Sequence, residues 1–271
     1  MPESVDLPAY LSRIGLPAAP ATATHQALQA LVLHHVQAIP FENLNPFAGL
    51  PVSLAPQDVQ RKLVRERRGG YCYEHNQLFG AVLRRLGFRV DDLSARVLWG
   101  QPDGAITPRS HMLLAVHLDE GPSIVDVGFG GQTPTGVLRL QADTPQDTPH
   151  GPYRLCRDAG SWRLQSRVQN DWRTLYRFDL QPAYPVDYDV SNYYLSTHPA
   201  SHFVTNLVAA RPTPHGRLAL LNRDYTEYRL DGTSTKRRLV GTAEIRAVLQ
   251  GEFGLALPDA PALDRRLDAL P

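Results

Sequence analysis

The stretch Arg68-Gly69-Gly70-Tyr71-Cys72-Tyr73-Glu74-His75-Asn76 holds the most informative pattern in this chain. Two glycines lead into a predicted helix whose first turn carries Cys72. The first N–H groups of a helix have no partners within it, and the helix dipole adds partial positive charge there. Both features favour the thiolate, which is the reactive form of cysteine, and can stabilise a developing oxyanion. Cys72 is therefore a candidate nucleophile, although most free cysteines are small buried apolar residues.

Helical spacing of apolar residues surrounds this stretch. The predicted helices cover residues 6–16, 25–38, about 56 to 68, and 72–86, with Gly87 closing the last one. Gly69 and Gly70 end the third helix, where we expect them to supply the left-handed or open conformations of a C-terminal turn.

After Gly87 the apolar period changes from helical to alternating, which predicts strands. The predicted strands lie at 90–99, 111–118, 124–128, 153–157, 162–167 and 172–178. They indicate an antiparallel meander that curls into a barrel. The last third is mixed, with a short helix at 188–195, strands at 207–210, 218–221, 225–230 and 237–240, and a helix capped by Thr242. No structure is assigned to the tail, 257–271.

Composition excludes several classes of protein. The chain has 271 residues, of which 42% are hydrophobic and 20% charged, and its net charge is +1. At about 150 residues per domain this predicts two or three modules. A near-zero charge argues against a nucleic-acid partner held by bulk charge. With no apolar run of about 18 residues we expect no membrane span, and with no basic or apolar leader we expect a cytoplasmic protein.

Two cysteines, Cys72 and Cys156, are too few for a disulfide framework or a four-cysteine zinc site. We expect free thiols, an inert Cys156 and no metal. His34, His35 and His75 have no ligand spacing with a cysteine pair, and His34 and His35 are interpreted as helix residues.

A thiolate catalyst needs a base, and the base needs an orienting group. His111 opens a predicted strand, and Asp126 lies in an apolar one, where a carboxylate must be paired. With a turn over 119–122, Asp126 faces about residue 115, on the same face as His111 but not opposite it. We expect a β-bulge or a longer turn to bring the two together. The alternative is a structural histidine.

The order Cys, His, Asp, with the nucleophile at a helix N-terminus and its partners on a following β-unit, is a cysteine-protease-like plan. It fits acyl transfer from a thioester or an amide. It does not identify the acyl group.

The chain resembles the arylamine N-acetyltransferase family, of a length that suits a bacterial member. Five ordered segments carry the resemblance: Ile39-Pro40-Phe41-Glu42-Asn43-Leu44, the Cys72 stretch quoted above, Pro108-Arg109-Ser110-His111-Met112, Asp126-Val127-Gly128-Phe129-Gly130, and 192–203 (NYYLSTHPASHF). No departure occurs at Cys72, His111 or Asp126. No motif carries over beyond about residue 205.

The resemblance implies an α+β fold of three parts with a cysteine-protease-like catalytic core. These are an N-terminal helical bundle with the Cys nucleophile (1–87), a β-barrel with His and Asp (88–195), and a C-terminal α/β lid (196–271). It also implies a ping-pong mechanism. Cys72 takes an acetyl group from acetyl-CoA, and an arylamine, arylhydrazine or hydrazide then attacks. By the family pattern His111 pairs with Cys72 and Asp126 orients His111.

The resemblance also implies binding residues. Phe41, Phe129, Phe203 and Tyr71 would line the acceptor cleft, where an aromatic amine needs flat apolar walls. Core packing is the alternative for the three phenylalanines.

For the CoA arm, the implied contacts are Trp99, Gly128 and Gly130; a barrel position is the alternative for Trp99. Apart from acetyl-CoA, the acyl donor, no cofactor is implied. The preferred acceptor, the acyl-chain preference and the oligomeric state stay open.

Polar residues beside the nucleophile have two interpretations. Arg68, Glu74 and Asn76 either hold the start of the helix or form a solvated face. The basic run 61–68 is typical of a solvated face, although it and Lys236-Arg237-Arg238 can also attract the anionic CoA.

Three other functions fit the same residues. One is an amide synthase that closes a macrolactam, and another is a cysteine hydrolase of the protease or transglutaminase type. The third is a non-catalytic ligand-binding protein with a degenerate triad, for which an unreactive Cys72 would be the sign.

Overall fold

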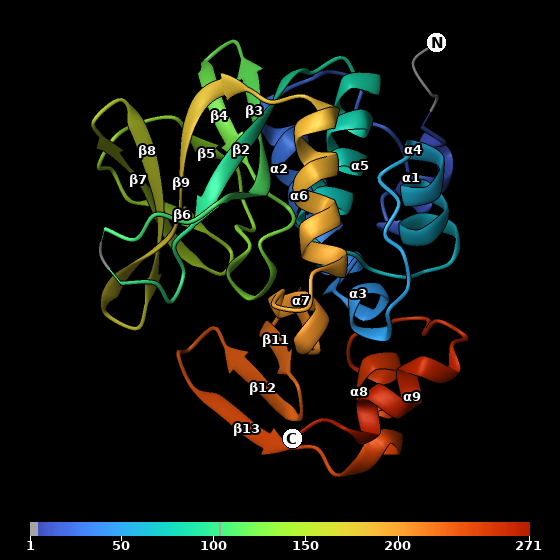
Figure 1. Cartoon of the computed structure of the whole chain (residues 1–271). Helices are drawn as coiled ribbons and strands as arrows, with labels where there is room; N and C mark the ends of the chain where they lie inside the picture. The colour runs from blue at the N-terminus through green and yellow to red at the C-terminus, as the bar shows by residue number, and fades with distance from the viewer. Residues whose placement is uncertain (1–4, 103) are drawn as a thin grey trace.

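Helices fill the first part of the chain, as the apolar spacing predicts (Figure 1). The structure, a computed structural model, describes residues 5–102 and 104–271. The helices of this part are α1 (Leu7–Arg13), α2 (His25–Ala38), α3 (Leu44–Ala48), α4 (Pro56–Gln60) with the π-helical turn η1 (Arg61–Arg65), and α5 (Cys72–Arg85). The bounds of α2 match the prediction, and α5 begins at Cys72 as expected. α3 was not predicted.

Local capping explains where the first helices begin. The Asp6 side chain accepts a hydrogen bond from Ala9 N, and the Thr24 side chain accepts one from Ala27 N. Each satisfies an N–H that the first turn leaves without a partner. α5 is buried along most of its length, and its apolar face shares one core with α1, α2 and strand residues such as Leu114.

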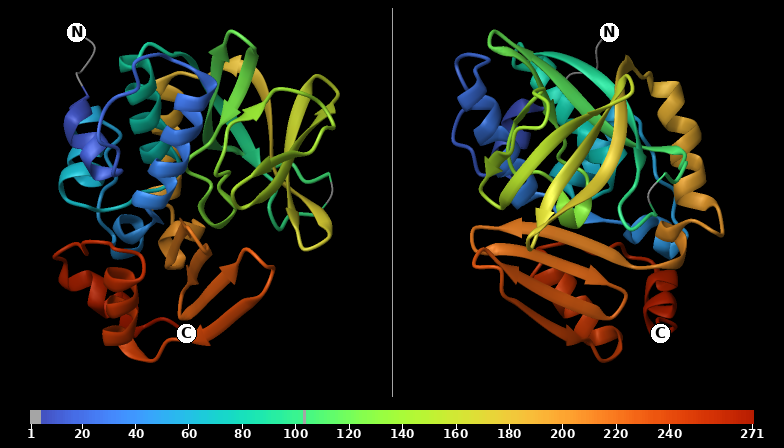
Figure 2. Two further views of the ribbon diagram at one scale, coloured as in Figure 1. Left: turned by 180° about the vertical axis from the view of Figure 1, so that it is seen from behind. Right: turned by 90° about the vertical axis from the view of Figure 1, so that its left-hand side faces the viewer.

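The central strands form one eight-stranded antiparallel sheet that curls into a nearly closed barrel (Figure 2). Its order is β5-β4-β3-β2-β9-β8-β7-β6. The strands are β2 (Arg89–Val97), β3 (Arg109–Leu118), β4 (Gly121–Val125), β5 (Leu138–Arg139), β6 (Gln146–Thr148), β7 (Gly151–Asp158), β8 (Ser161–Val168) and β9 (Asp171–Pro182). The predicted α+β class and barrel are confirmed.

A side chain links the two edges of the barrel. Gln146 Oε1 accepts from Arg139 N at 2.8 Å, and Gln146 Nε2 donates to Arg139 O at 2.9 Å. The amide thus takes up backbone groups that an open edge would leave unpaired.

The β3–β4 hairpin differs from the prediction in its register. Leu114 pairs with Val125 and Leu118 with Gly121, so residues 119–120 alone form the turn. The strand ends at Val125, and Asp126 follows it instead of lying inside it. If the register is continued, residue 126 falls opposite Leu113, two positions closer to His111 than predicted. The β3–β4 pairing contains neither a bulge nor a longer turn, and its shorter turn brings the two residues closer. A register shift does lie beside His111, but in the pairing of β3 with β2, between Ala95 and Arg96.

The last part contains a second sheet, of order β1-β10-β11-β12-β13. Its strands are β1 (Phe41–Glu42), β10 (Val208–Thr213), β11 (Gly216–Leu221), β12 (Asp224–Arg229) and β13 (Ser234–Arg238), and it shares a core with α8 (Gly241–Gly251), α9 (Pro261–Asp268) and α3. α6 (Pro185–Thr197) and α7 (His202–Thr205) connect it to the barrel.

Several details of this part were not predicted. α9 forms in the tail that received no assignment. The N-cap of α8 is Val240, so the predicted cap at Thr242 is wrong. The edge strand β1 comes from the N-terminal part of the chain. The predicted boundary at 195/196 lies inside α6, and the division into three domains stays a prediction.

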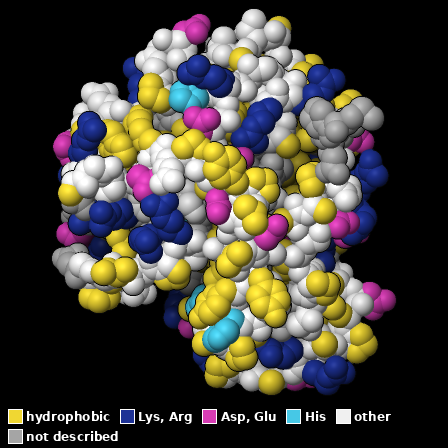
Figure 3. Space-filling model, turned by 45° about the horizontal axis from the view of Figure 1, so that its top comes forward, with side chains coloured by type: hydrophobic (Ala, Val, Ile, Leu, Met, Phe, Trp, Pro, Cys, Tyr) yellow, Lys and Arg dark blue, Asp and Glu magenta, His cyan; other side chains and the backbone are white. Residues whose placement is uncertain are grey.

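The surface mixes charges of both signs. On the face drawn in Figure 3, basic and acidic side chains are interspersed with apolar ones. Within the residues that the structure describes, no helix is both long and apolar enough to cross a membrane.

Candidate active site

Cys72 is the first residue of α5, and 4% of its surface is exposed. The Glu74 side chain holds this helix start, since Tyr71 N donates to Glu74 Oε2 at 3.1 Å. The thiol lies 3.9 Å from the carbonyl oxygen of Ser110, which precedes His111 on β3. The nucleophile predicted from the sequence is thus placed where the helical part meets the barrel.

The two glycines before Cys72 are needed for space. A Cβ on Gly69 would lie 2.1 Å from Pro40 O, and one on Gly70 would lie 2.6 Å from Glu74 Oε2. Neither has the positive φ of a left-handed turn; Arg67, with φ 51°, takes that conformation instead. The predicted left-handed role of the glycines is therefore wrong, and close approach of backbone to neighbouring groups replaces it.

A buried ionic cluster supports this turn. Lys62 Nζ lies 2.7 Å from Glu74 Oε1 and 4.0 Å from Glu42 Oε1, and Arg68 Nη2 lies 3.0 Å from Glu42 Oε1. All four side chains are buried, so for Lys62 and Arg68 the expected solvated face is wrong. Such a cluster tolerates the loss of one partner poorly, because the remaining charge would be buried alone.

Burial and pairing act against each other on the two carboxyl groups of this cluster. Burial raises the pKa of Glu42, but Arg68, Lys62 and the N–H of Leu44 outweigh it and leave the pKa low. For Glu74 burial prevails over Lys62, and the pKa is raised.

His111 and Asp126 contact one another directly. His111 Nε2 lies 2.7 Å from Asp126 Oδ2. Asp126 Oδ1 accepts from Gly128 N at 2.9 Å and from Asn76 Nδ2 at 3.0 Å. Asn76 belongs to α5, and its Oδ1 accepts from Val127 N, so it joins the helix of the nucleophile to the loop of the carboxylate.

These contacts keep His111 positively charged. Burial lowers its pKa, but the charge of Asp126 and hydrogen bonds to Asp126 and Cys72 raise it to about 10. Burial likewise raises the pKa of Asp126, while His111, Gly128 N and Asn76 lower it below its ordinary value. Because Nε2 is bound to Asp126, the other ring nitrogen is left for Cys72. The arrangement can hold a thiolate and an imidazolium side by side.

The four aromatic residues predicted for the acceptor fall into two groups. Phe129 packs edge-on against His111, with ring centroids 5.1 Å apart. Phe203 packs on Phe41 at 5.9 Å and on Tyr71 at 5.4 Å. The Tyr71 hydroxyl bonds to Asn192 of α6. One group lies beside the base and the other beside the helix start.

Gly128 and Gly130 contact protein groups of this site. A Cβ on Gly128 would lie 2.8 Å from Cys72 Cα, so its lack of a side chain lets α5 approach the Asp126 loop. Gly130 has φ 73°, and a Cβ there would lie 3.5 Å from the Phe41 ring. Their assignment to CoA stays a prediction.

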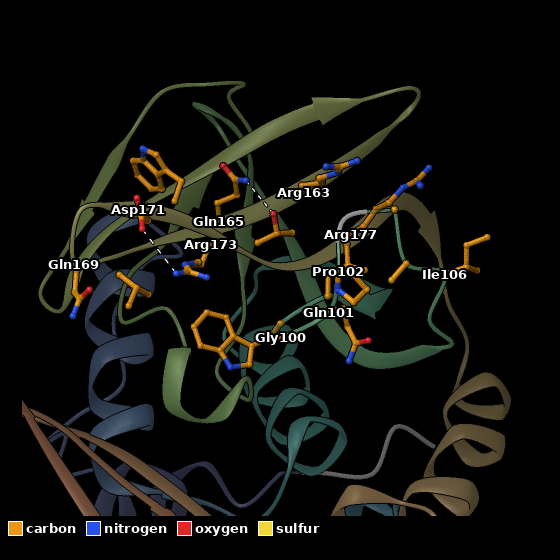
Figure 4. A pocket seen from close by; sticks show the side chains of 17 residues that line it. Gly100, Gln101, Pro102, Ile106, Arg163, Gln165, Gln169, Asp171, Arg173 and Arg177 are labelled. Atoms are coloured by element: carbon orange, nitrogen blue, oxygen red, sulfur yellow. Dashed lines mark hydrogen bonds and ion pairs between the residues drawn. The ribbon is translucent and has the colours of Figure 1, made fainter. Parts of the chain in front are cut away.

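Trp99 lies on a cavity of about 1230 Å³ at the outer face of the barrel (Figure 4). Its lining includes Trp172 and the arginines Arg163, Arg173 and Arg177. The neighbouring positions Leu164 and Tyr176 belong to the barrel core. Tyr176 also packs on His111 at 5.0 Å, so one strand, β9, has the cavity on one face and the base on the other.

Sequence reasoning missed two supports of the site. Glu42 received no role because its partner Arg68 is 26 residues away, and no local pattern indicates the pair. Asn192 binds Tyr71 across 121 residues. Within 5–102 and 104–271, no group of three or more His, Cys, Asp or Glu side chains is arranged to hold a metal ion.

Comparisons with known proteins agree with one another. A family model described as N-acetyltransferase matches residues 24–262. The arylamine N-acetyltransferase of Mycobacterium tuberculosis H37Rv is 45% identical over 274 residues, which cover 98% of this chain and 96% of that protein. The Escherichia coli K12 enzyme is 42% identical over 252 residues, or 93% and 89%. The structure of Mycobacterium marinum arylamine N-acetyltransferase in complex with CoA has a TM-score of 0.93 at 41% identity, covering 98% of this chain and 99% of that one.

Gly69 packs too closely on Pro40 O to carry a side chain. Because the added Cβ of Gly69→Ala overlaps Pro40 O, we expect it to lower the free energy of unfolding by about 1–3 kcal/mol and to slow alkylation of Cys72. Gly131→Ala is the matched control, since a Cβ there meets nothing within 4 Å. Thermal denaturation gives the Tm of each variant. Equal Tm values for Gly69→Ala and Gly131→Ala would contradict the predicted overlap with Pro40 O.

Asp126→Asn removes the carboxylate that His111 Nε2 contacts. Without the carboxylate, burial prevails and His111 is neutral, so alkylation of Cys72 by iodoacetamide at about pH 6 should slow by about a hundredfold. The rate of the unsubstituted chain, whose His111 has its pKa raised to about 10, is measured over the same range, about pH 6 to pH 9. The measurement uses a Cys156→Ser background, although burial already raises the pKa of Cys156. A variant profile that overlays that of the unsubstituted chain would refute it.

The same shift predicts the pH dependence of stability. The pKa of His111 is raised in the folded chain from 6.5 to about 10. Its pairing therefore contributes fully to the free energy of unfolding below pH 6.5, and the contribution is lost as the pH rises through 10. Urea titrations across this range measure it, and Asp126→Asn should lack the decline.

Proposed function

This chain belongs to the arylamine N-acetyltransferase family, and we propose that it moves an acetyl group from acetyl-CoA to an aromatic amine, hydrazine or hydrazide through a thioester on Cys72. The family predicted from the five motifs is thereby confirmed. The observation that supports the mechanism is the contact of a helix-terminal thiol with a charged, carboxylate-bound histidine. No observation favours an amide synthase or a hydrolase.

In the first half-reaction the Cys72 thiolate attacks the carbonyl carbon of acetyl-CoA. The new C–S bond to Cys72 forms, and the bond to the CoA sulfur breaks. The departing CoA thiolate takes the proton of the His111 imidazolium and leaves as the thiol. His111 is then neutral and ready to accept a proton.

In the second half-reaction the amine nitrogen attacks the thioester. His111 takes a proton from this nitrogen, the amide bond forms, and Cys72 leaves as a thiolate. Asp126 keeps its charge throughout and stabilises the imidazolium that returns. The partial positive charge at the start of α5 stabilises the oxyanion in both steps.

The acceptor is proposed to lie against the aromatic walls. Phe129 packs on His111, which places a flat apolar surface beside the base that must receive the proton of the amine. Phe203 supplies a second wall next to Tyr71, the residue before the nucleophile. Flat rings at these two places suit an aromatic ring in the acceptor.

The CoA arm is proposed to reach Trp99. The outer cavity that Trp99 lines carries Arg163, Arg173 and Arg177; among the described residues of its lining the one carboxylate is that of Asp171, which lies 3.9 Å from Arg173 Nη2. Guanidinium groups bind phosphate oxygens in pairs, and an indole face offers a stacking surface. The phosphates and the adenine of CoA match this chemistry.

Intact-protein mass spectrometry tests the mechanism. Mixing with acetyl-CoA and no amine should add one acetyl group, which an arylhydrazine then removes. Cys72→Ala should gain none. Cys156→Ala, which removes the other thiol, should behave as the unsubstituted chain does.

Other results would redirect the assignment. Turnover that persists in Cys72→Ala would refute the thioester. No adduct, with Cys72 still readily alkylated, would keep the nucleophile but exclude acetyl-CoA as its donor, and would favour the amide synthase or hydrolase.

The position of Trp99 gives a further prediction. Trp99→Ala should raise the KM for acetyl-CoA by about tenfold, because an aromatic stacking contact contributes roughly 1 kcal/mol or more. The KM for the amine and the alkylation rate of Cys72 should not change. Steady-state kinetics measure it, and an unchanged KM for acetyl-CoA would remove Trp99 from the donor site.

A further inference from the structure

A chain of three buried polar rings runs from α1 to the turn before the nucleophile. Tyr10 Oη lies 2.8 Å from His35 Nδ1, His35 Nε2 lies 2.9 Å from His75 Nδ1, and His75 Nε2 lies 3.1 Å from Pro40 O. Their exposed fractions are 0%, 0% and 1%. We call Tyr10, His35 and His75 the ring relay. None of them has a part in the two half-reactions above.

The direction of the ring relay follows from its last acceptor. A carbonyl oxygen only accepts, so His75 Nε2 must carry a hydrogen. In a neutral imidazole His75 Nδ1 then accepts, which requires a hydrogen on His35 Nε2. His35 Nδ1 accepts in turn from the Tyr10 hydroxyl. One arrangement of hydrogens satisfies every ring nitrogen.

Both histidines are kept neutral. Burial lowers the pKa of His35, and repulsion from Arg13 and from any protonated form of His75 acts in the same direction. Burial lowers the pKa of His75 to about 4; Lys62 acts in the same direction, and Glu42 and the bond to Pro40 O act against it. The ring of Phe79, on α5, packs edge-on against His35, with the ring centroids 5.1 Å apart.

The ring relay ends on the backbone that holds the nucleophile turn. Pro40 O, the acceptor of His75, also accepts from Gly70 N at 3.4 Å. Glu42 N donates back to Gly70 O at 2.8 Å. Gly70 is two residues before Cys72, and Phe41, between Pro40 and Glu42, is one of the predicted acceptor walls.

We propose that Tyr10, His35 and His75 are positioning residues that hold the Pro40 carbonyl, and through it the Gly70 turn, so that Cys72 is presented to His111. Apolar side chains could fill the same volume without the cost of burying polar groups. In the ring relay, three buried polar residues instead form a chain of hydrogen bonds that ends on one carbonyl oxygen, that of Pro40. The proposal deepens the acyl-transfer function and rests on it for the acetylation readout alone.

Substitutions at His75 separate positioning from packing. His75→Phe keeps a ring but removes the donor to Pro40 O, and should slow both iodoacetamide alkylation and single-turnover acetylation of Cys72 by about tenfold. His75→Gln retains a side-chain donor and should recover most of the rate. Tyr10→Phe, which removes the first donor, should slow both reactions by a smaller factor.

His34→Phe is the matched control. His34, on α2, forms a hydrogen bond from Nδ1 to Ile14 O at 3.0 Å. This variant therefore also removes a hydrogen bond between a histidine and a carbonyl, but the carbonyl is that of Ile14 and not that of Pro40. Its rates should equal those of the unsubstituted chain. The Tm of every variant is measured beside the rates.

Two outcomes would overturn the proposal. One is a rate for His75→Phe equal to that of the unsubstituted chain. The other is a loss that follows Tm across all variants, His34→Phe included. Alkylation needs no CoA, so the expected alkylation pattern in a chain that acetyl-CoA never acetylates would uphold the ring relay and refute the proposed function.

Discussion

The close approach of two backbone segments, Pro40–Glu42 and Gly69–Gly70, is the constraint on which the rest of the site depends. The carbonyl of Pro40 occupies the space of a Gly69 side chain, and the second segment exchanges hydrogen bonds with the first. The charges of Glu42 and Arg68 meet beside this contact, out of water. Because α5 starts directly after it, the contact fixes the first turn of the helix and with it the thiol.

A second junction brings the barrel to that thiol. Because Gly128 has no Cβ, which would lie 2.8 Å from Cys72 Cα, the loop after β4 can approach α5, and Asn76 binds both Asp126 and Val127 N. Asp126 raises the pKa of the buried His111, while His111, Gly128 N and Asn76 together lower the pKa of Asp126. Geometry and electrostatics therefore have one origin. The groups that fix the distance between α5 and the barrel also favour the protonated form of His111.

Much of this could be predicted from local pattern, and the rest could not, for physical reasons. α2 follows from apolar spacing and Pro40, and the start of α5 from its glycines, because these signals lie within a few residues. The predicted register of the β3–β4 hairpin was wrong because the length of the turn, and not the pattern of the strands, decides which residues face each other. β1 and the Glu42–Arg68 pair depend on partners far along the chain. The roles of the predicted substrate and CoA residues stay predictions.

The membership of β1 in the second sheet has a consequence for how the chain can be made and divided. Glu42 pairs with Ala209, so the edge of that sheet is supplied by a segment synthesised long before the strand it covers. During translation the emerging N-terminal helices must keep this segment available until residue 209 leaves the ribosome. A fragment that starts after the barrel would leave the backbone N–H and C=O groups along the edge of β10 unpaired, and they could pair with another copy of the fragment. The pairing of β1 with β10 thus joins the first third of the chain to the last, and neither part can be exchanged without the other.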